Sequence, residues 1–130
     1  MGDTNKFLKQ SVFAVAGASE DREKYGNKTL RVYQQNNMKV YPLNPKSTQI
    51  EGLDVIRDVA SLPDSVDALS IVTPPAVTRH IVKAALDKGI KHFWMQPGAE
   101  NDEAIAEAEK AGANVIYGGP CVLVALNYRE

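Results

Sequence analysis

Cysteine is nearly absent from this chain, and other defining features are missing too. Cys121 is the one cysteine in 130 residues, so the chain forms no internal disulfide, and this favours a reducing compartment. No apolar run approaches the roughly 20 residues that a membrane span needs, and residues 1–6 are polar, unlike a signal peptide. We therefore expect a cytoplasmic protein with no membrane partner.

The chain also lacks an excess of charge of either sign. Its 15 basic and 16 acidic residues give a formal net charge of -1, which provides no electrostatic footprint for nucleic acid. No metal-ligand spacing occurs. The composition, 44% hydrophobic and 24% charged, is that of an ordinary globular protein. The length predicts a single domain over residues 1–130.

The stretch SVFAVAGAS at residues 11–19 organises what is present. Val12–Ala16 is predicted to be a buried strand, and Gly17, Ala18 and Ser19 form a small-residue turn that leaves room for phosphates against the backbone. A helix from about Tyr25 to Asn36 follows. The free N–H groups and the positive dipole at its start favour an anion. Strand, tight loop and helix are the opening of a nucleotide-binding α/β domain.

The remaining segments alternate between strand and helix. We expect strands at 39–43, 52–55, 68–72, 91–95 and 114–117, helices at 76–88 and 102–111, and a helical turn at 58–62. Such alternation implies right-handed crossovers. The predicted fold is an α/β, Rossmann-like, doubly wound sheet, mainly parallel, with five to six strands flanked by helices in three layers. Pro42 indicates either an edge position for its strand or the last paired residue of that strand.

Ligands of such sheets lie over the carboxyl ends of the strands. The segments that follow those ends are 17–19, 44–46, 73–75 and 96–98, and three of the four contain proline. Proline forms a stiff wall without an N–H donor, which suits flat contact with adenine. Ser19 has a hydroxyl for a phosphate, and Arg22, Lys24 or Lys46 add positive charge. Tyr25, beside the phosphate loop, is a further candidate contact.

The usual dinucleotide fingerprint is missing. Gly17 stands alone, since the next glycine, Gly26, is too far along the chain for G-x-G-x-x-G. An acid that would bind the ribose 2′-hydroxyl is replaced by Asn44, Pro45 and Lys46. A cation there favours a phosphorylated ribose, as in NADP or coenzyme A, and the pattern does not separate these two.

Five short motifs resemble one family. VAGAS at 15–19, KYG at 24–26, VYPLNP at 40–45, VTPP at 72–75 and WMQPG at 94–98 look like the motif series of the small CoA-binding domain family. That domain is similar to the N-terminal domain of the succinyl-CoA synthetase α-subunit. The resemblance covers about residues 11–121 and implies a Rossmann-type fold that binds coenzyme A or an acyl-CoA.

The resemblance also implies roles for individual residues. Gly17, Ala18 and Ser19 would meet the phosphates. Asn44, Pro45 and Lys46 would meet the adenosine end with its 3′-phosphate, and Thr73, Pro74 and Pro75 would wall the nucleotide. The expected binding set is completed by Lys24, Tyr25, Gln96 and Gly98. The sequence departs from the family at 96–98 and 118–121, on the pantetheine side, and the synthetase's phosphohistidine domain is absent, so ligase activity does not carry over.

No catalytic constellation emerges. His80 lies within a helix, His92 opens a strand at the end opposite the ligand edge, and Cys121 is either a small buried residue or a thiol at the pocket. We expect a non-catalytic protein that binds coenzyme A or its thioesters. The alternatives are an NADP-type or other nucleotide-binding oxidoreductase and a scaffold with an empty site. The apolar segment 122–126 predicts a homodimer contact or packing onto its own domain.

Overall fold

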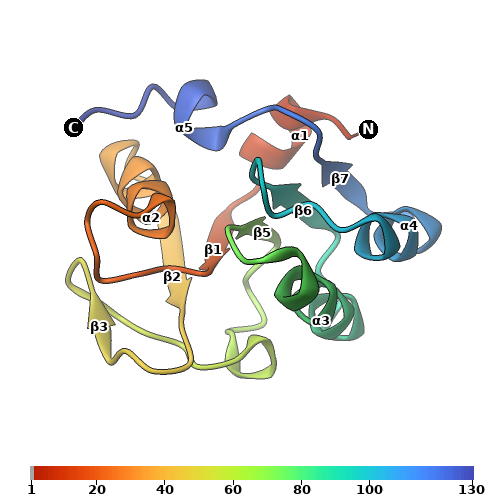
Figure 1. Cartoon of the computed structure of the whole chain (residues 1–130), viewed down its shortest axis with the longest axis horizontal. Helices are drawn as coiled ribbons and strands as arrows, with labels where there is room; N and C mark the ends of the chain where they lie inside the picture. The colour runs from red at the N-terminus through yellow and green to blue at the C-terminus, as the bar shows by residue number, and fades with distance from the viewer. Residues whose placement is uncertain (1) are drawn as a thin grey trace.

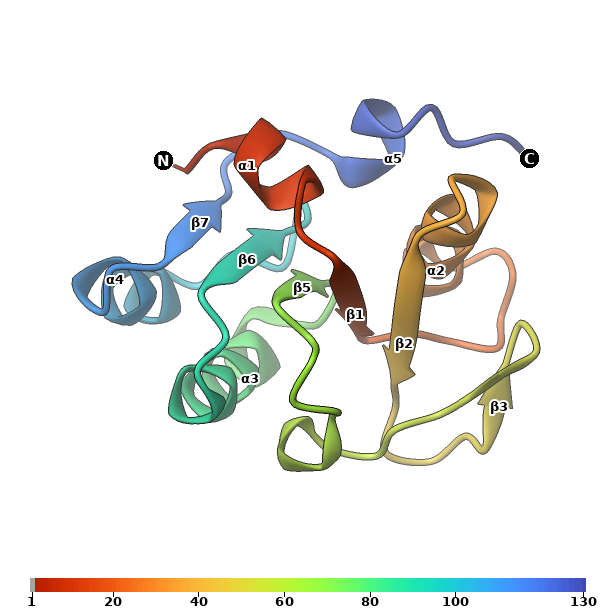
Figure 2. The ribbon, with the colours of Figure 1, turned by 180° about the vertical axis from the view of Figure 1, so that it is seen from behind.

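The computed structural model describes residues 2–130 (Figures 1 and 2). Its helices are α1 (Thr4–Leu8), α2 (Tyr25–Gln35), α3 (Pro75–Lys88), α4 (Asp102–Lys110) and α5 (Val122–Ala125). Its strands are β1 (Val12–Ala16), β2 (Lys39–Leu43), β3 (Gln49–Ile50), β4 (Leu53–Asp54), β5 (Ala68–Ile71), β6 (His92–Met95) and β7 (Asn114–Ile116), and a 3₁₀ turn covers Val59–Ser61.

Five strands form one parallel sheet in the order β2-β1-β5-β6-β7. The order reverses between β1 and β5, so the chain adds strands first on one side of β1 and then on the other. This is the predicted Rossmann-like, doubly wound architecture. β2 is an edge strand, which is one of the two positions that Pro42 indicated.

Helices cover both faces of the sheet and make three layers (Figure 2). Alternate residues of β1 point to opposite faces: Phe13 and Val15 pack with α1, α2 and α5, whereas Ala14 and Ala16 pack toward α3 and α4. Phe13 stacks on Tyr33 of α2 with ring centroids 4.9 Å apart. The sheet is therefore buried on both sides, as parallel sheets usually are.

The strand expected at 52–55 does not belong to the main sheet. Residues Leu53–Asp54 pair antiparallel with Gln49–Ile50 in a separate hairpin. The turn between them has positive φ at both Glu51 and Gly52, the backbone of a tight two-residue hairpin. The hairpin lies beside α2 and the edge of β2, where it becomes relevant to the site.

The helical period predicts a buried face of α3 made of Val77, Ile81, Ala84 and Ala85. Of these four, Ala85 alone is buried, and Thr78 and Val82 complete the buried face instead. Val77 is 43% exposed, whereas Thr78 and Val82 are fully buried. Thr78 is tolerated inside because its hydroxyl hydrogen-bonds the Thr73 hydroxyl at 2.8 Å and donates to the Pro74 carbonyl at 3.3 Å. A satisfied polar side chain thus replaced the apolar one that the periodicity predicted.

The last apolar segment packs back onto its own domain. Val122 and Leu123 are buried in the layer of α2, and the Trp94 indole donates to the Pro120 carbonyl at 3.0 Å. Val124 is 77% exposed. The homodimer stays a prediction.

Candidate functional site

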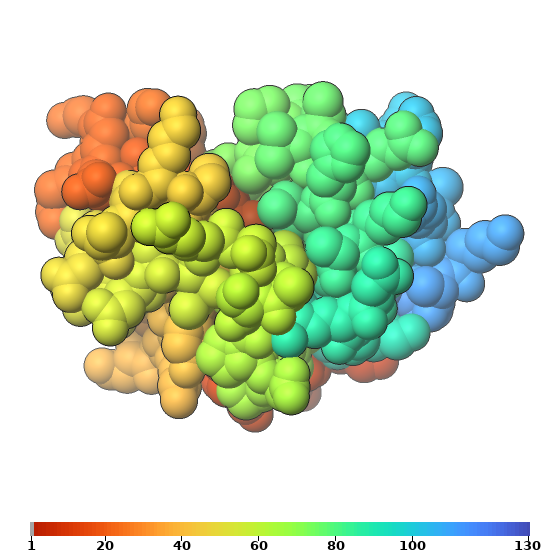
Figure 3. All heavy atoms as spheres, turned by 90° about the horizontal axis from the view of Figure 1, so that it is seen from below, coloured from red at the N-terminus to blue at the C-terminus, as the bar shows by residue number. Residues whose placement is uncertain are grey.

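A pocket of about 350 Å³ lies at the carboxyl ends of β1 and β5, where the strand order reverses. This switch point is the usual ligand position in open α/β sheets. Figure 3 shows a notch here, between the orange and yellow atoms of the segments after β1 and β2 and the green atoms at the start of α3. The lining residues are Gly17, Ala18, Ser19, Lys24, Tyr25, Gly26, Asn44, Val72, Thr73 and Pro74.

Two glycines shape the floor of this pocket. Gly17 has φ +88°, and a Cβ on it would lie 2.4 Å from the Val72 carbonyl oxygen. A Cβ on Gly26 would lie 2.0 Å from the Gly17 carbonyl oxygen. Gly26, nine residues on, therefore allows the close approach of helix and loop that a later glycine of the usual fingerprint provides. The sequence analysis excluded Gly26 from a glycine fingerprint because of its spacing, although Gly26 lies within the KYG motif.

Backbone donors at the pocket are left open. Within residues 2–130, the N–H groups of Ala18, Ser19, Tyr25 and Gly26 have no intramolecular acceptor, and Lys24 at the N-cap of α2 makes no side-chain cap. Free N–H groups at the start of a helix form a ready anion site. Since the pocket is lined by these same residues, it suits the phosphates of a nucleotide.

Nearby cations differ in availability. Arg22 is committed to Glu51, with Nη1 and Oε1 2.5 Å apart. Lys24 lines the pocket and is exposed. Lys28 lies over the Tyr25 ring, 5.6 Å from its centroid, and pairs with Glu130 at 3.3 Å. Lys24 is therefore the pocket-lining cation among the predicted ones.

The segment after β2 is attached to the phosphate loop by Asn44. Its Nδ2 donates to the Ala18 carbonyl at 2.9 Å, and its Oδ1 accepts from the N–H groups of Lys46 and Ser47. Pro45 and Lys46 are exposed and do not line the pocket. Pro75 starts α3 and also lies outside the lining. Their predicted ligand contacts stay predictions.

The notch continues past Tyr25 and Val72 into a second cavity of about 250 Å³, lined also by Gln96, Pro97 and Cys121. A third, of about 210 Å³, adds Gly98. The Gln96 amide is committed: Nε2 donates to Cys121 Sγ at 3.2 Å, and Oε1 accepts from the Val122 N–H at 2.9 Å. Gln96 thus anchors the start of α5 at the edge of the cavity, and the Cys121 thiol lies there too.

Behind the phosphate loop lies a buried polar network that the sequence analysis missed. Asn27 and Arg31, one turn apart on α2, are 0% and 8% exposed. Asn27 Nδ2 donates to the Ser19 carbonyl at 2.9 Å and to Glu51 Oε2 at 3.1 Å, and Arg31 Nε donates to Asn27 Oδ1 at 2.6 Å. The Asn27 hydrogen bond, and then the one from Arg22, lower the pKa of Glu51 below its ordinary value.

Candidate catalytic groups stay apart from this pocket. His80 is exposed on α3. His92 lies at the opposite end of the sheet, and its Nδ1 is 3.3 Å from the Asn114 amide. Among residues 2–130, no cluster of three or more histidines, cysteines or acids is arranged to hold a metal ion. No helix in this described part of the chain is long and apolar enough to cross a membrane.

A family model described as a CoA binding domain matches residues 11–127. This chain belongs to the CoA-binding domain family. The match spans every strand of the sheet and the whole pocket, and it confirms the resemblance seen in the five motifs.

Relatives of this CoA-binding domain include parts of larger enzymes. It is 33% identical over 129 residues to the acetate–CoA ligase (ADP-forming) II subunit alpha of Pyrococcus furiosus, covering 89% of this chain and 28% of that protein. An acetate–CoA ligase (ADP-forming) of Methanocaldococcus jannaschii is 32% identical over 78 residues, 60% of this chain and 11% of that protein. The match thus spans 28% of one of these curated relatives and 11% of the other.

Solved structures share the fold of this CoA-binding domain. A conserved hypothetical protein from Pyrococcus furiosus has a TM-score of 0.83 and 39% identity, covering 88% of this chain and 97% of that one. The dinucleotide-forming acetyl-coenzyme A synthetase 1 of Ca. Korarchaeum cryptofilum, solved with phosphate and ADP, has a TM-score of 0.77 and 29% identity, covering 92% of this chain and 28% of that one.

Proposed function

We propose that this chain binds coenzyme A or an acyl-CoA at the pocket between β1 and β5 and does not catalyse a reaction by itself. The observation that carries the proposal is the family match over residues 11–127, which contains a pocket whose backbone donors are open to phosphates. The single cysteine further supports a reducing, cytoplasmic location.

The site suggests where each part of the ligand would lie along the notch. The diphosphate would meet the N–H groups of Ala18 and Ser19 and the Lys24 ammonium group. The adenosine would lie toward Asn44, with its 3′-phosphate within reach of Lys46 on the exposed segment after β2. The second cavity, past Tyr25 and Val72, would take the apolar arm.

The composition of the pocket linings favours a binding role. Among residues 2–130, the pocket linings contain no histidine and no carboxylate, and Cys121 is the one nucleophilic thiol near them. The titratable side chains in these linings are Lys24, Tyr25 and Cys121, and in the described residues none of the three hydrogen-bonds to a histidine or a carboxylate that would activate it. The whole-enzyme activities of the ligases belong to those longer proteins.

A charge reversal at Lys46 tests the proposal. Lys46→Glu is expected to weaken coenzyme A binding by about tenfold, because a cation beside the 3′-phosphate becomes an anion. Binding of 3′-dephospho-coenzyme A should change by less than about twofold. Isothermal titration measures both, and Lys83→Glu, an exposed charge reversal on α3, is the matched control. Equal losses for the two ligands would remove the role of Lys46.

A further inference from the structure

The loop between β1 and α2 is densely charged and exposed to solvent. Residues 20–24 read Glu-Asp-Arg-Glu-Lys, and all five are exposed. Exposed polar loops are ordinarily the mobile part of a domain. Ser19 and Lys24, at the two ends of this run, line the pocket. A ligand held by both ends needs the loop in one conformation.

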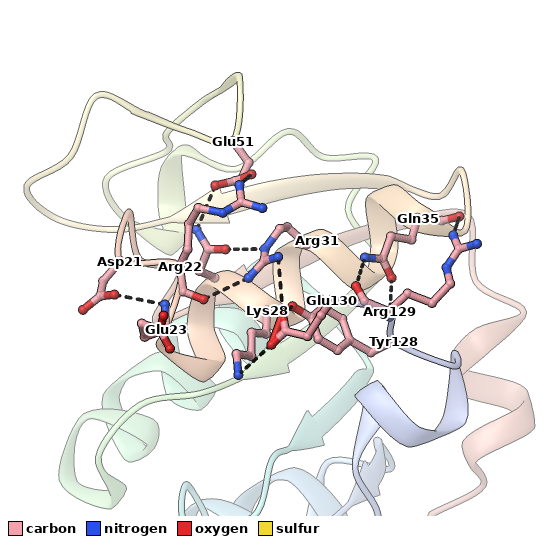
Figure 4. A network of polar contacts seen from close by, with 11 residues as sticks. Asp21, Arg22, Glu23, Lys28, Arg31, Gln35, Glu51, Tyr128, Arg129 and Glu130 are labelled. Atoms are coloured by element: carbon pink, nitrogen blue, oxygen red, sulfur yellow. Dashed lines mark hydrogen bonds and ion pairs between the residues drawn. The ribbon is translucent and has the colours of Figure 1, made fainter.

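Two buried side chains of α2 hold this loop by its carbonyl oxygens. The Asn27 amide donates to the Ser19 carbonyl at 2.9 Å, and Arg31 Nη2 donates to the Arg22 carbonyl at 2.9 Å. The two are four residues apart, so they lie on one face of the helix, and Arg31 Nε donates to Asn27 Oδ1. Figure 4 shows the Arg31 guanidinium reaching Arg22. The loop backbone is therefore fixed at two points.

The β3–β4 hairpin backs the same network from the other side. Glu51, in the hairpin turn, accepts from the Asn27 amide and from the Arg22 guanidinium. Ser47, on the segment that leads into the hairpin, donates from Oγ to Glu20 Oε2 at 2.9 Å. Both hydrogens of the Asn27 amide and its oxygen are used. Burying an arginine and an asparagine is costly unless their polar atoms are paired. These paired polar atoms hold the carbonyl groups of Ser19 and Arg22 in fixed positions.

We propose that Asn27 and Arg31 are positioning residues, which act through the loop of residues 19–24 to preorganise the anion pocket. The inference rests on the proposed function for the identity of the ligand, and its structural part is independent of any ligand. Neither side chain lines the pocket, so the effect on binding is indirect. Preorganisation lowers the ordering cost that a ligand would otherwise bear.

Two variants on α2 separate positioning from general stability. Asn27→Ala removes both hydrogen bonds that reach the loop and the hairpin. Gln34→Ala is the matched control: Gln34 Nε2 donates to the Glu51 carbonyl at 3.0 Å, on the same helix and hairpin, without touching the loop. Arg31→Lys keeps the positive charge and loses the forked donation. It serves as a second variant if Asn27→Ala does not fold.

The first measurement uses the protein without ligand. Trypsin recognises the exposed Arg22 and Lys24, and cleavage after them in the folded protein reports opening of the loop. We expect cleavage about tenfold faster in Asn27→Ala than in wild type, the equivalent of losing roughly one well-made buried hydrogen bond. Gln34→Ala should stay within about twofold of wild type.

The second measurement titrates the same variants with coenzyme A well below their melting temperatures. Asn27→Ala should bind about tenfold more weakly at unchanged stoichiometry, and Gln34→Ala within about twofold of wild type. Equal cleavage rates in the two variants, or a freed loop with unchanged affinity, would overturn the positioning role. A wild-type protein that binds no coenzyme A would overturn the proposed function, while the trypsin comparison still decides whether Asn27 restrains the loop.

Discussion

The backbone N–H groups at the two ends of the sheet differ in whether they have hydrogen-bond acceptors. At the amino end, the Asp67 carboxylate accepts from the N–H groups of Ser11 and Val12 at 3.1 and 3.0 Å. The Asn114 side chain accepts from the Asp3 N–H at 2.7 Å and donates to the Asp3 carbonyl at 3.0 Å. Chain segments that enter the sheet are thus bonded through side chains from distant parts of the sequence.

At the carboxyl end, the donors are left open instead. Gly17 and Gly26 bring the backbone of loop and helix together, and the N–H groups of Ala18 and Ser19 point to no acceptor in residues 2–130. Such groups are costly in a dry site and useful where an anion binds. The amino end is thus a closed end, whose bonded N–H groups stabilise the fold, and the carboxyl end is an open end, whose N–H groups are left for an anion. Substitutions at the two ends should therefore have separable effects on stability and on binding.

The largest expected effect comes from Gly26→Ala at the open end. The new Cβ would lie 2.0 Å from the Gly17 carbonyl oxygen, so α2 and the phosphate loop must separate. We expect a loss of about 3 kcal/mol in the free energy of unfolding, measured by chemical denaturation, together with loss of coenzyme A binding. Gly89→Ala is the control, since its Cβ meets no atom within 4 Å. Its cost should be about 1 kcal/mol, from φ +94° alone.

Asp67→Ala tests the closed end of the sheet, where stability and not binding should change. It leaves the N–H groups of Ser11 and Val12 without their acceptors. The free energy of unfolding should fall by about 2 kcal/mol, and the affinity for coenzyme A should stay within about twofold of wild type. A fall in affinity as large as that of a pocket variant would contradict the separation of the two ends.

The smallest expected effect is a pH dependence at the closed end. Burial, and then the positive charge of Lys6, lower the pKa of His92 below its ordinary value. The unfolded chain therefore binds a proton more readily than the folded one, and stability should fall as the pH drops below about 6.5. Melting temperatures at pH 5.5 and 7.5 measure this, and His92→Gln should reduce the difference. An unchanged difference would assign it to other groups.

Most of the fold follows from local signals in the sequence. Val12–Ala16 and Lys39–Leu43 are strands with the predicted bounds, Asn101 caps α4 through a hydrogen bond to the Ala104 N–H, and Pro42 marks an edge strand. These features depend on short-range pattern and capping chemistry. The β3–β4 hairpin was misassigned because pairing between two-residue strands is decided by the turn and by contacts with α2.

The site was predictable in position and less so in its detail. The strand-end segments come together because parallel strands share a carboxyl edge, so Gly17–Ser19, Asn44 and Thr73–Pro74 line one pocket. The buried pair Asn27 and Arg31 was not predictable, because polar residues on a helix normally face solvent. Their i, i+4 spacing places them on one face of α2. The sequence does not show that the loop of residues 19–24 lies against that face.

The measurement that tests the central claim most directly is isothermal titration of the wild-type protein with coenzyme A, 3′-dephospho-coenzyme A, NADPH and NADH side by side. The proposed function predicts measurable binding of coenzyme A, weaker binding after removal of the 3′-phosphate, and weaker binding still of both nicotinamide cofactors. A preference for NADPH over coenzyme A would contradict it and favour an oxidoreductase. Binding of none of the four would contradict it as well, and would leave a Rossmann-like scaffold.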